Sequence, residues 1–177
     1  MGEVGCLKDG NFQNLLGENA LIESLGHKLP VVSITSPTYE PTVSQSGTIF
    51  TLNKEDGIEI TLPTAEAGLV YEFYVETPFT SGNFSIDASD SDKLQGLIMM
   101  APSAKNDYSE NTLKHGTDGP AIDDTKYLSD TDRTGRLEGT HLIFKCVGAS
   151  TAAGANRQWL VSGHAVTSGD IGTPFRT

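Results

Sequence analysis

The sequence has few positive charges, only two cysteines and no long apolar run. Its 177 residues contain 12 Lys and Arg against 23 Asp and Glu, for a formal net charge of −11. The clustered Lys and Arg that phosphate backbones require are missing, so nucleic acid is not expected as a ligand. No apolar run approaches the roughly 18 residues of a membrane-spanning helix, and the N-terminus lacks a basic segment followed by an apolar one. We therefore expect a soluble protein without a secretory signal or a membrane partner.

The two cysteines, Cys6 and Cys146, could be free thiols or form one disulfide. Cys146 lies in the apolar run Leu142–Val147 and is typical of a small buried hydrophobe, the usual fate of a free cysteine. A disulfide between Cys6 and Cys146 stays as an alternative, although nothing in the sequence demands an oxidising compartment.

Catalytic motifs are also missing. The four histidines (His27, His115, His141 and His164) show no metal-binding spacing, and neither a Gly-x-Ser-x-Gly elbow nor a Gly-rich phosphate loop occurs. His141 and His164 adjoin predicted strands and are interpreted as surface or hydrogen-bonded residues. We predict that the protein is not an enzyme, that it needs no cofactor and that no residue is catalytic, cofactor-binding or metal-ligating.

Two acidic segments are the nearest approach to a metal site. Asp130–Gly135 copies the start of an EF-hand calcium loop, with oxygen ligands at alternate positions followed by a glycine. The final position, which should be a bidentate Glu, is His141, and Glu138 comes too early, so we interpret the segment as a solvated turn. A second acidic group, interpreted as loop caps, consists of Asp87, Asp90 and Asp92.

Alternating apolar residues are what the sequence does contain. Residues 58–62 and 69–75 each alternate between apolar and mostly polar side chains, which predicts two half-buried strands. The Pro-to-Gly break at 63–68 is expected to turn the chain back, so that the two strands become neighbours. Glu59 and Glu72 would then face each other on the outward side.

Further runs bring the total to seven or eight strands of about five residues, which favours a mainly β fold. These runs lie at residues 31–34, 48–52, 83–86, 94–100, 140–147 and 158–163. We predict a single antiparallel β-sandwich, jelly-roll or barrel-like domain. Its predicted core consists of Ile58, Ile60, Leu62, Tyr71, Phe73, Leu142, Phe144, Trp159 and Val161.

Two segments stand apart from this pattern. Residues 1–46 are predicted to form an N-terminal arm and a Pro-rich linker, and residues 47–177 the β domain, which contains a long irregular loop at 101–139. The arm carries apolar residues at helical spacing but is too short and too interrupted to fold alone. It either packs on its own domain or reaches a neighbouring subunit, and we predict that the arm makes the intersubunit or capsid contact while the β domain presents it. The predicted partner-binding residues are Phe12, Leu15, Leu16, Leu21, Ile22 and Leu25.

The strand patterns resemble those of small β-rich structural proteins of tailed bacteriophages, most of all capsid decoration (cement) proteins. The resemblance covers about residues 47–163 and is carried by Ile58–Phe73, Asn83–Ile86, Leu142–Gly148 and Gln158–Gly163. It implies a virion protein, made in the host cytoplasm, that binds the outside of an assembled capsid as a homo-oligomer, typically a trimer. Its partner would be the major capsid protein, whose neighbouring subunits it would bridge.

The alternative function is that of a tail or fibre protein that binds or degrades host surface glycan. It would use the 101–139 loop and exposed aromatic side chains, for which Phe79, Tyr108 and Tyr127 are the candidates. Trp159 is a less suitable glycan platform, because it shares a strand face with Val161 and is predicted to lie in the core.

Overall fold

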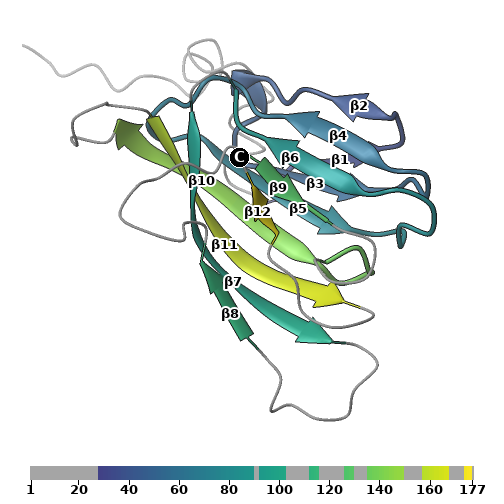
Figure 1. Cartoon of the computed structure of the whole chain (residues 1–177). Coiled ribbons are helices and arrows are strands. Elements are labelled where there is room, and N and C mark those ends of the chain that lie inside the picture. Colours follow the sequence, from purple (N-terminus) through teal and green to yellow (C-terminus); the bar gives the residue numbers. More distant parts are fainter. Residues whose placement is uncertain are drawn as a thin grey trace, which may run out of the picture. The chain divides into compact units, whose positions relative to one another are not determined.

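Strands make up nearly all of the regular structure (Figure 1). The structure is a computed structural model that describes residues 28–89, 92–102, 112–115, 126–129, 135–149, 157–167 and 174–176. The chain divides into two units, Met1–Pro30 and Val31–Thr177, and every described strand belongs to the second unit. No helix in the described residues is long and apolar enough to cross a membrane.

The second unit contains two β-sheets and a short 3-10 helix, η1 (Val43–Gln45). The seven-stranded sheet consists, in spatial order, of β1 (Val31–Ile34), β3 (Thr48–Leu52), β5 (Val70–Val75), β10 (His141–Ala149), β11 (Arg157–Thr167), β7 (Lys93–Pro102) and β8 (Thr112–His115). The five-stranded sheet consists of β12 (Phe175–Arg176), β9 (Lys126–Leu128), β6 (Phe84–Asp87), β4 (Ile58–Thr61) and β2 (Thr38–Tyr39).

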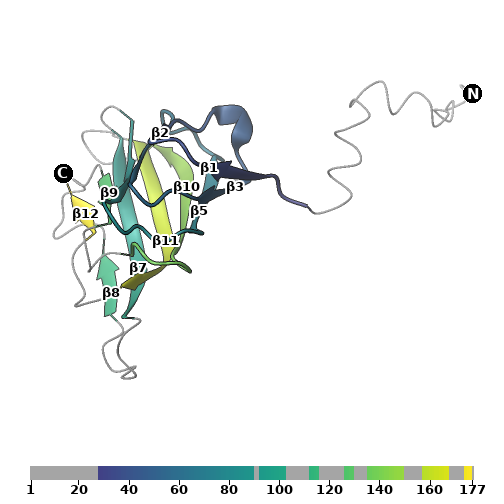
Figure 2. The same ribbon diagram turned by 90° about the vertical axis from the view of Figure 1, so that its right-hand side faces the viewer.

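The first six strands alternate between the two sheets, so that residues 31–87 form three stacked coils. The odd-numbered strands β1, β3 and β5 pair in parallel in one sheet, and β2, β4 and β6 pair in parallel in the other (Figures 1 and 2). Equivalent side chains lie in register from coil to coil, as in the row Ile34, Leu52 and Val75. Because the chain crosses to the other sheet after each strand, it always returns in the same direction.

The predicted hairpin between residues 58–62 and 69–75 is therefore wrong. β4 and β5 belong to different sheets, and Glu59 and Glu72 do not face each other. The segment 63–68 carries the chain across the core instead of reversing it, and Ala65 at its centre is fully buried. Apolar alternation shows that both segments are strands, but it does not show which sheet each strand joins.

The later strands follow a different path. β10 and β11 form an antiparallel pair that lies between β5 and β7, and β11 then pairs in parallel with β7. At Gly96 of β7 the two backbones approach so closely that an added Cβ would lie 1.8 Å from the carbonyl oxygen of Val161. Any side chain there would separate β7 from β11, so this contact requires glycine.

The mainly β fold class is confirmed, but the sheets are mixed rather than antiparallel. Five of the ten strand pairs among the described residues are parallel. Neither sheet closes into a barrel, since β1 and β8 end one sheet and β12 and β2 end the other. β1 agrees with the strand predicted at 31–34, whereas the Pro-rich linker that follows it contains β2 and η1, and the predicted loop at 101–139 contains β8 and β9.

One core lies between the two sheets, and aromatic rings run through it from coil to coil. Phe50 contacts Tyr39 and Phe73 with ring centroids 5.5 and 5.4 Å apart, and Phe73 contacts Phe144 at 5.6 Å. All nine predicted core residues are buried, which confirms that prediction. Cys146 is a buried free thiol, as its apolar surroundings indicated.

Candidate functional site

Some of the sites suggested by the sequence lie outside the described residues, and most of the others form no ligand site. The six predicted partner-binding residues of the arm lie outside the described residues, as do Asp90, Tyr108 and the segment 130–134. Among the residues that the structure does describe, no group of three or more His, Cys, Asp and Glu side chains is arranged to hold a metal ion.

The two described aspartates of the group at 87–92 have structural hydrogen bonds. The carboxylate of Asp92 is buried and accepts the backbone N–H of Ala65 at 2.6 Å, which fixes the crossing between β4 and β5. The carboxylate of Asp87 accepts the hydroxyl of Ser85 at 3.0 Å. The partner of Asp92 lies 27 residues away in the sequence, so its hydrogen bond joins distant segments and is not the local loop cap that was expected.

Two of the three aromatic residues proposed for glycan binding are buried, which corrects the expectation that they are exposed. Phe79 packs on Phe84 with ring centroids 5.2 Å apart, and Phe84 stacks on Tyr127 at 5.5 Å. Burial raises the pKa of Tyr127 above its ordinary value. Trp159 is fully buried as predicted and contacts Tyr71. These rings belong to the core, and none is available for stacking on a sugar.

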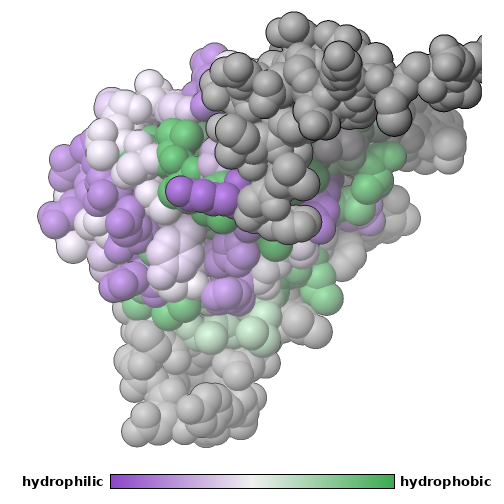
Figure 3. Space-filling model, turned by 180° about the vertical axis from the view of Figure 1, so that it is seen from behind, coloured by the Kyte–Doolittle hydropathy of each residue, from purple (hydrophilic) through white to green (hydrophobic). Residues whose placement is uncertain are grey.

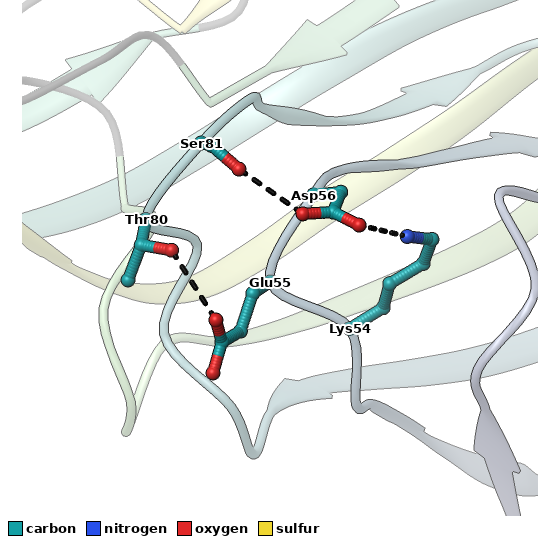
Figure 4. Close-up of polar contacts among 5 residues, drawn as sticks. All are labelled: Lys54, Glu55, Asp56, Thr80 and Ser81. Carbon is teal, nitrogen blue, oxygen red and sulfur yellow. Dashed lines mark hydrogen bonds and ion pairs between the residues drawn. The ribbon is translucent and has the colours of Figure 1, made fainter.

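The polar contacts shown in Figure 4 join the turn after β3 to the turn after β5. The hydroxyl of Ser81 donates to Asp56 at 3.1 Å, and that of Thr80 donates to Glu55 at 3.5 Å. Hydrogen bonds from Lys54 (2.9 Å) and Ser81, together with the positive charge of Lys54, lower the pKa of Asp56. The carboxylates of Glu55 and Asp56 thus contact the next coil at the surface.

The backbones of these two turns are also in close contact. The N–H groups of Thr80 and Ser81 both donate to the carbonyl oxygen of Glu55, at 3.2 and 3.3 Å. An added Cβ at Gly82 would lie 2.3 Å from the carbonyl oxygen of Asp56, so the contact tolerates only glycine. We interpret this arrangement as part of the scaffold.

The remaining candidate is the outer face of the seven-stranded sheet, meaning the side chains that point away from the core. Along each strand these side chains alternate with buried ones, as in β5, where Val70, Glu72 and Tyr74 alternate with three buried residues. The other members, taken strand by strand, are Val31, Ser33, Ile49, Thr51, Lys93, Gln95, Leu97, Met99, Ala101, His141, Ile143, Lys145, Val147, Leu160, Ser162, His164 and Val166.

Three large apolar side chains on this face form what we call the apolar patch: Leu97, Met99 and Leu160. They are 46, 45 and 37% exposed. Leu97 and Met99 alternate along β7, and Leu160 lies on the neighbouring strand β11, where Ser162 is paired with Leu97. Figure 3, which views the molecule from the side of the seven-stranded sheet, shows hydrophobic residues interspersed with hydrophilic ones.

A polar cluster lies beside the apolar patch. His141 and His164 are directly opposite each other on β10 and β11, with ring centroids 5.9 Å apart, and His164 is also in register with Met99. The Nε2 atom of His141 lies 3.1 Å from a carboxylate oxygen of Glu72 on β5. Both partners of this contact are about 30% exposed, at 30 and 27%. The cluster can therefore offer hydrogen-bond donors and acceptors to a partner.

Sequence reasoning missed this cluster because it depends on strand register. His141 and His164 are far apart in the sequence and meet only because β10 pairs with β11. The pairing shifts between Cys146 and Ala149, so the register cannot be counted back from the loop between the strands. The interpretation of both histidines as surface or hydrogen-bonded residues nevertheless agrees with the structure.

The outer face is also distinctive in charge. Its described ionic side chains are Glu72, Lys93 and Lys145, so one negative charge stands against two positive ones. The chain as a whole has a net charge of −11. Of the described acidic residues, Glu72 alone lies on this face, and the other side chains of the face are mostly apolar, histidine, hydroxyl or lysine. Such a surface is suited to contact with another macromolecule.

No family model, no curated protein and no solved structure matches this chain.

Proposed function

We propose that this chain is a non-enzymatic structural protein of a tailed-phage virion, which binds the outer surface of the assembled capsid. It would stabilise the capsid by bridging major capsid subunits. Two arguments support the proposal: the resemblance of residues 47–163 to decoration proteins, and the character of the outer face. The second is the structural observation that carries it.

The apolar patch is the part of the outer face that we expect to contact the capsid. Large side chains that are nearly half exposed, such as Leu97 and Met99, leave apolar area in water, and removing that area on binding is favourable by about 25 cal/mol per Å². Interface centres are depleted in charge and enriched in Met and aromatic side chains. Met99 and Tyr74 lie on this face with few charges nearby. His141 and His164 would provide hydrogen bonds at the border of the contact.

The finer parts of the proposal follow from the resemblance. The two sheets around one core are compatible with a β-sandwich, and we retain a sandwich or jelly roll as the proposed fold family. We also retain a homo-oligomer, with the trimer as the state that the resemblance implies. The arm residues Phe12, Leu15, Leu16, Leu21, Ile22 and Leu25 stay a second proposed contact.

The alternative is a tail or fibre protein that recognises glycan, and one experiment separates the two functions. Purified protein is incubated with empty capsids and, separately, with host surface polysaccharide, and bound protein is measured by co-sedimentation. We expect saturable binding to capsids and none to polysaccharide. Binding to polysaccharide without binding to capsids would reverse the assignment.

A deletion of residues 1–30 distinguishes the two proposed contacts. If the outer face is sufficient, the shortened protein still saturates the capsid. If the arm is required, occupancy falls although the β domain remains folded, which circular dichroism would verify. The outer-face variants described in the Discussion supply the complementary measurement.

A further inference from the structure

Among the described residues, the edge of the seven-stranded sheet at β1 has backbone groups without a partner strand. There β1 pairs with β3 alone, and the carbonyl oxygen of Ile34 accepts the N–H of Asn53 in the next coil at 2.9 Å. The N–H and C=O of one residue point to the same side of a strand, and the side alternates along the strand. Val32 and Ile34 therefore face β3, whereas Val31 and Ser33 face the open edge. In the described part of the chain, no strand pairs with that edge.

The other described edges are shorter or better protected. β2 has two residues, and the carbonyl oxygen of Thr38 accepts the hydroxyl of Ser36 at 2.7 Å. β12 also has two residues, and the sequence of β8 includes Lys114. Charged residues and short strands are common means by which proteins prevent edge-to-edge pairing.

β1 has neither of these protections. Its sequence is Val-Val-Ser-Ile, without a charged residue, and Val31 is 61% exposed. β-Branched residues favour the extended conformation that pairing requires. The strand therefore presents a four-residue edge that is ready to accept another strand.

We propose that β1 pairs with β1 of a second copy of this chain, antiparallel about a two-fold axis that passes between the two Val32 residues. In this register each Val31 lies opposite Ser33 of the second copy, so the outward-facing residues form two hydrogen-bonded pairs with four backbone hydrogen bonds. A register shifted by one residue would place outward-facing groups opposite inward-facing ones. The two seven-stranded sheets would become one continuous sheet.

A second copy is the occupant that this edge fits best, because a two-fold axis makes any strand edge complementary to itself. The strand carries no charge of its own, so no like charges are brought together within the new ladder, despite the net charge of −11. Only four residues per chain contribute, so the contact is expected to be weak. The inference does not depend on the proposed capsid function, and a two-fold dimer differs from the trimer that the resemblance implies.

Sedimentation equilibrium of the full chain tests the pairing. We expect a monomer–dimer equilibrium within the concentration range from about 1 to 300 μM, which covers affinities typical of weak contacts. Ser33→Pro removes an edge N–H, and Ser33→Lys adds a charge without altering the backbone; each should raise the dimer dissociation constant at least tenfold. Ser33→Ala, the matched control, should not change it. The melting temperature of each variant shows whether it is folded.

A cysteine placed on the two-fold axis provides an independent readout of the register. Opposed residues in a non-hydrogen-bonded antiparallel pair have Cα atoms about 4.5 Å apart, within the range that disulfides bridge. In a Cys6→Ser background, Val32→Cys should give a disulfide-linked dimer on mild oxidation. Val31→Cys, opposite Ser33 of the second copy, should give much less.

The proposal is overturned by any of three results. These are a monomer at every concentration, an oligomer whose dissociation constant is unaffected by Ser33→Pro and Ser33→Lys, or equal crosslinking of Val31→Cys and Val32→Cys. A trimer that persists in the Ser33 variants would favour the assembly implied by the resemblance, with contacts elsewhere on the chain.

Discussion

The outer faces of the two sheets differ, although both sheets cover the same core. The described outward positions of the five-stranded sheet include Thr38, Glu59, Thr61 and Asp87. Those of the seven-stranded sheet include the apolar patch and only one acid, Glu72. A half-buried sheet needs polar residues outside merely to remain soluble. The five-stranded sheet follows that rule, whereas the seven-stranded sheet carries exposed apolar side chains, on which the binding role proposed above rests.

The comparison depends first on the correct assignment of inner and outer residues. Trp159 is buried and its neighbour Leu160 is exposed on the same strand. Trp159→Ala should lower the free energy of unfolding by about 3–5 kcal/mol, because it leaves a large cavity. Leu160→Ala should change it by about 0.5 kcal/mol or less. Urea denaturation of both variants gives these values, and equal losses would show that the two faces are wrongly assigned.

The second prediction concerns the contact that fixes the crossing between the sheets. Asp92→Ala removes the buried hydrogen bond from the carboxylate to the N–H of Ala65, and should cost about 1.5–3 kcal/mol of unfolding free energy, as expected for a charged acceptor. Asp92→Asn keeps an acceptor oxygen and should cost less. If both variants are as stable as the parent, the crossing is held by other contacts.

The sequence was sufficient to predict the longer strands and the inner residues, but not the short strands β2, β8, β9 and β12 or the way the strands are connected. Alternation identifies Phe73 and Trp159 as core because each face of a strand repeats every second residue. It cannot show that residues 63–68 cross between sheets, since a crossing and a hairpin use the same turn residues. Phe79 is buried by a loop that folds onto Phe84, a tertiary contact without a local pattern. The cluster of His141 and His164 depends on register in the same way.

Alkaline pH should destabilise the fold through Tyr127, whose side chain is buried on the inner side of the five-stranded sheet. Burial raises the pKa of Tyr127 in the folded protein. A raised pKa means that the neutral phenol stabilises the fold below the unfolded value of about 10, and that this contribution is lost as the pH rises through the folded value. Tyrosinate absorbance from Tyr127 should therefore appear together with unfolding by circular dichroism. Tyr127→Phe should abolish that component, and ionisation of Tyr127 before unfolding would contradict its burial.

A smaller effect of pH on stability is expected from Asp56, in the turn that contacts the third coil. The hydrogen bonds from Lys54 and Ser81 lower the pKa of Asp56 in the folded protein. A lowered pKa stabilises the fold above the unfolded value of about 4, and this contribution is lost as the pH falls through the folded value. Lys54→Ala should shift the titration of Asp56 upward, as measured by NMR of the carboxyl carbon. Because Asp56 is exposed, little change in stability is expected, and an unshifted titration would show that the pair does not persist in solution.

The binding role of the outer face is tested most directly by a matched pair of double variants. Leu97→Ser with Leu160→Ser removes two of the three residues of the apolar patch, whereas Thr38→Ser with Glu59→Ser changes the outer face of the five-stranded sheet. Both proteins are first shown to melt like the parent and are then titrated onto empty capsids. We expect at least a tenfold loss of capsid affinity, or about 1.4 kcal/mol, for the apolar-patch variant and no loss for the other. Parental affinity in the apolar-patch variant would show that the outer face does not bind the capsid.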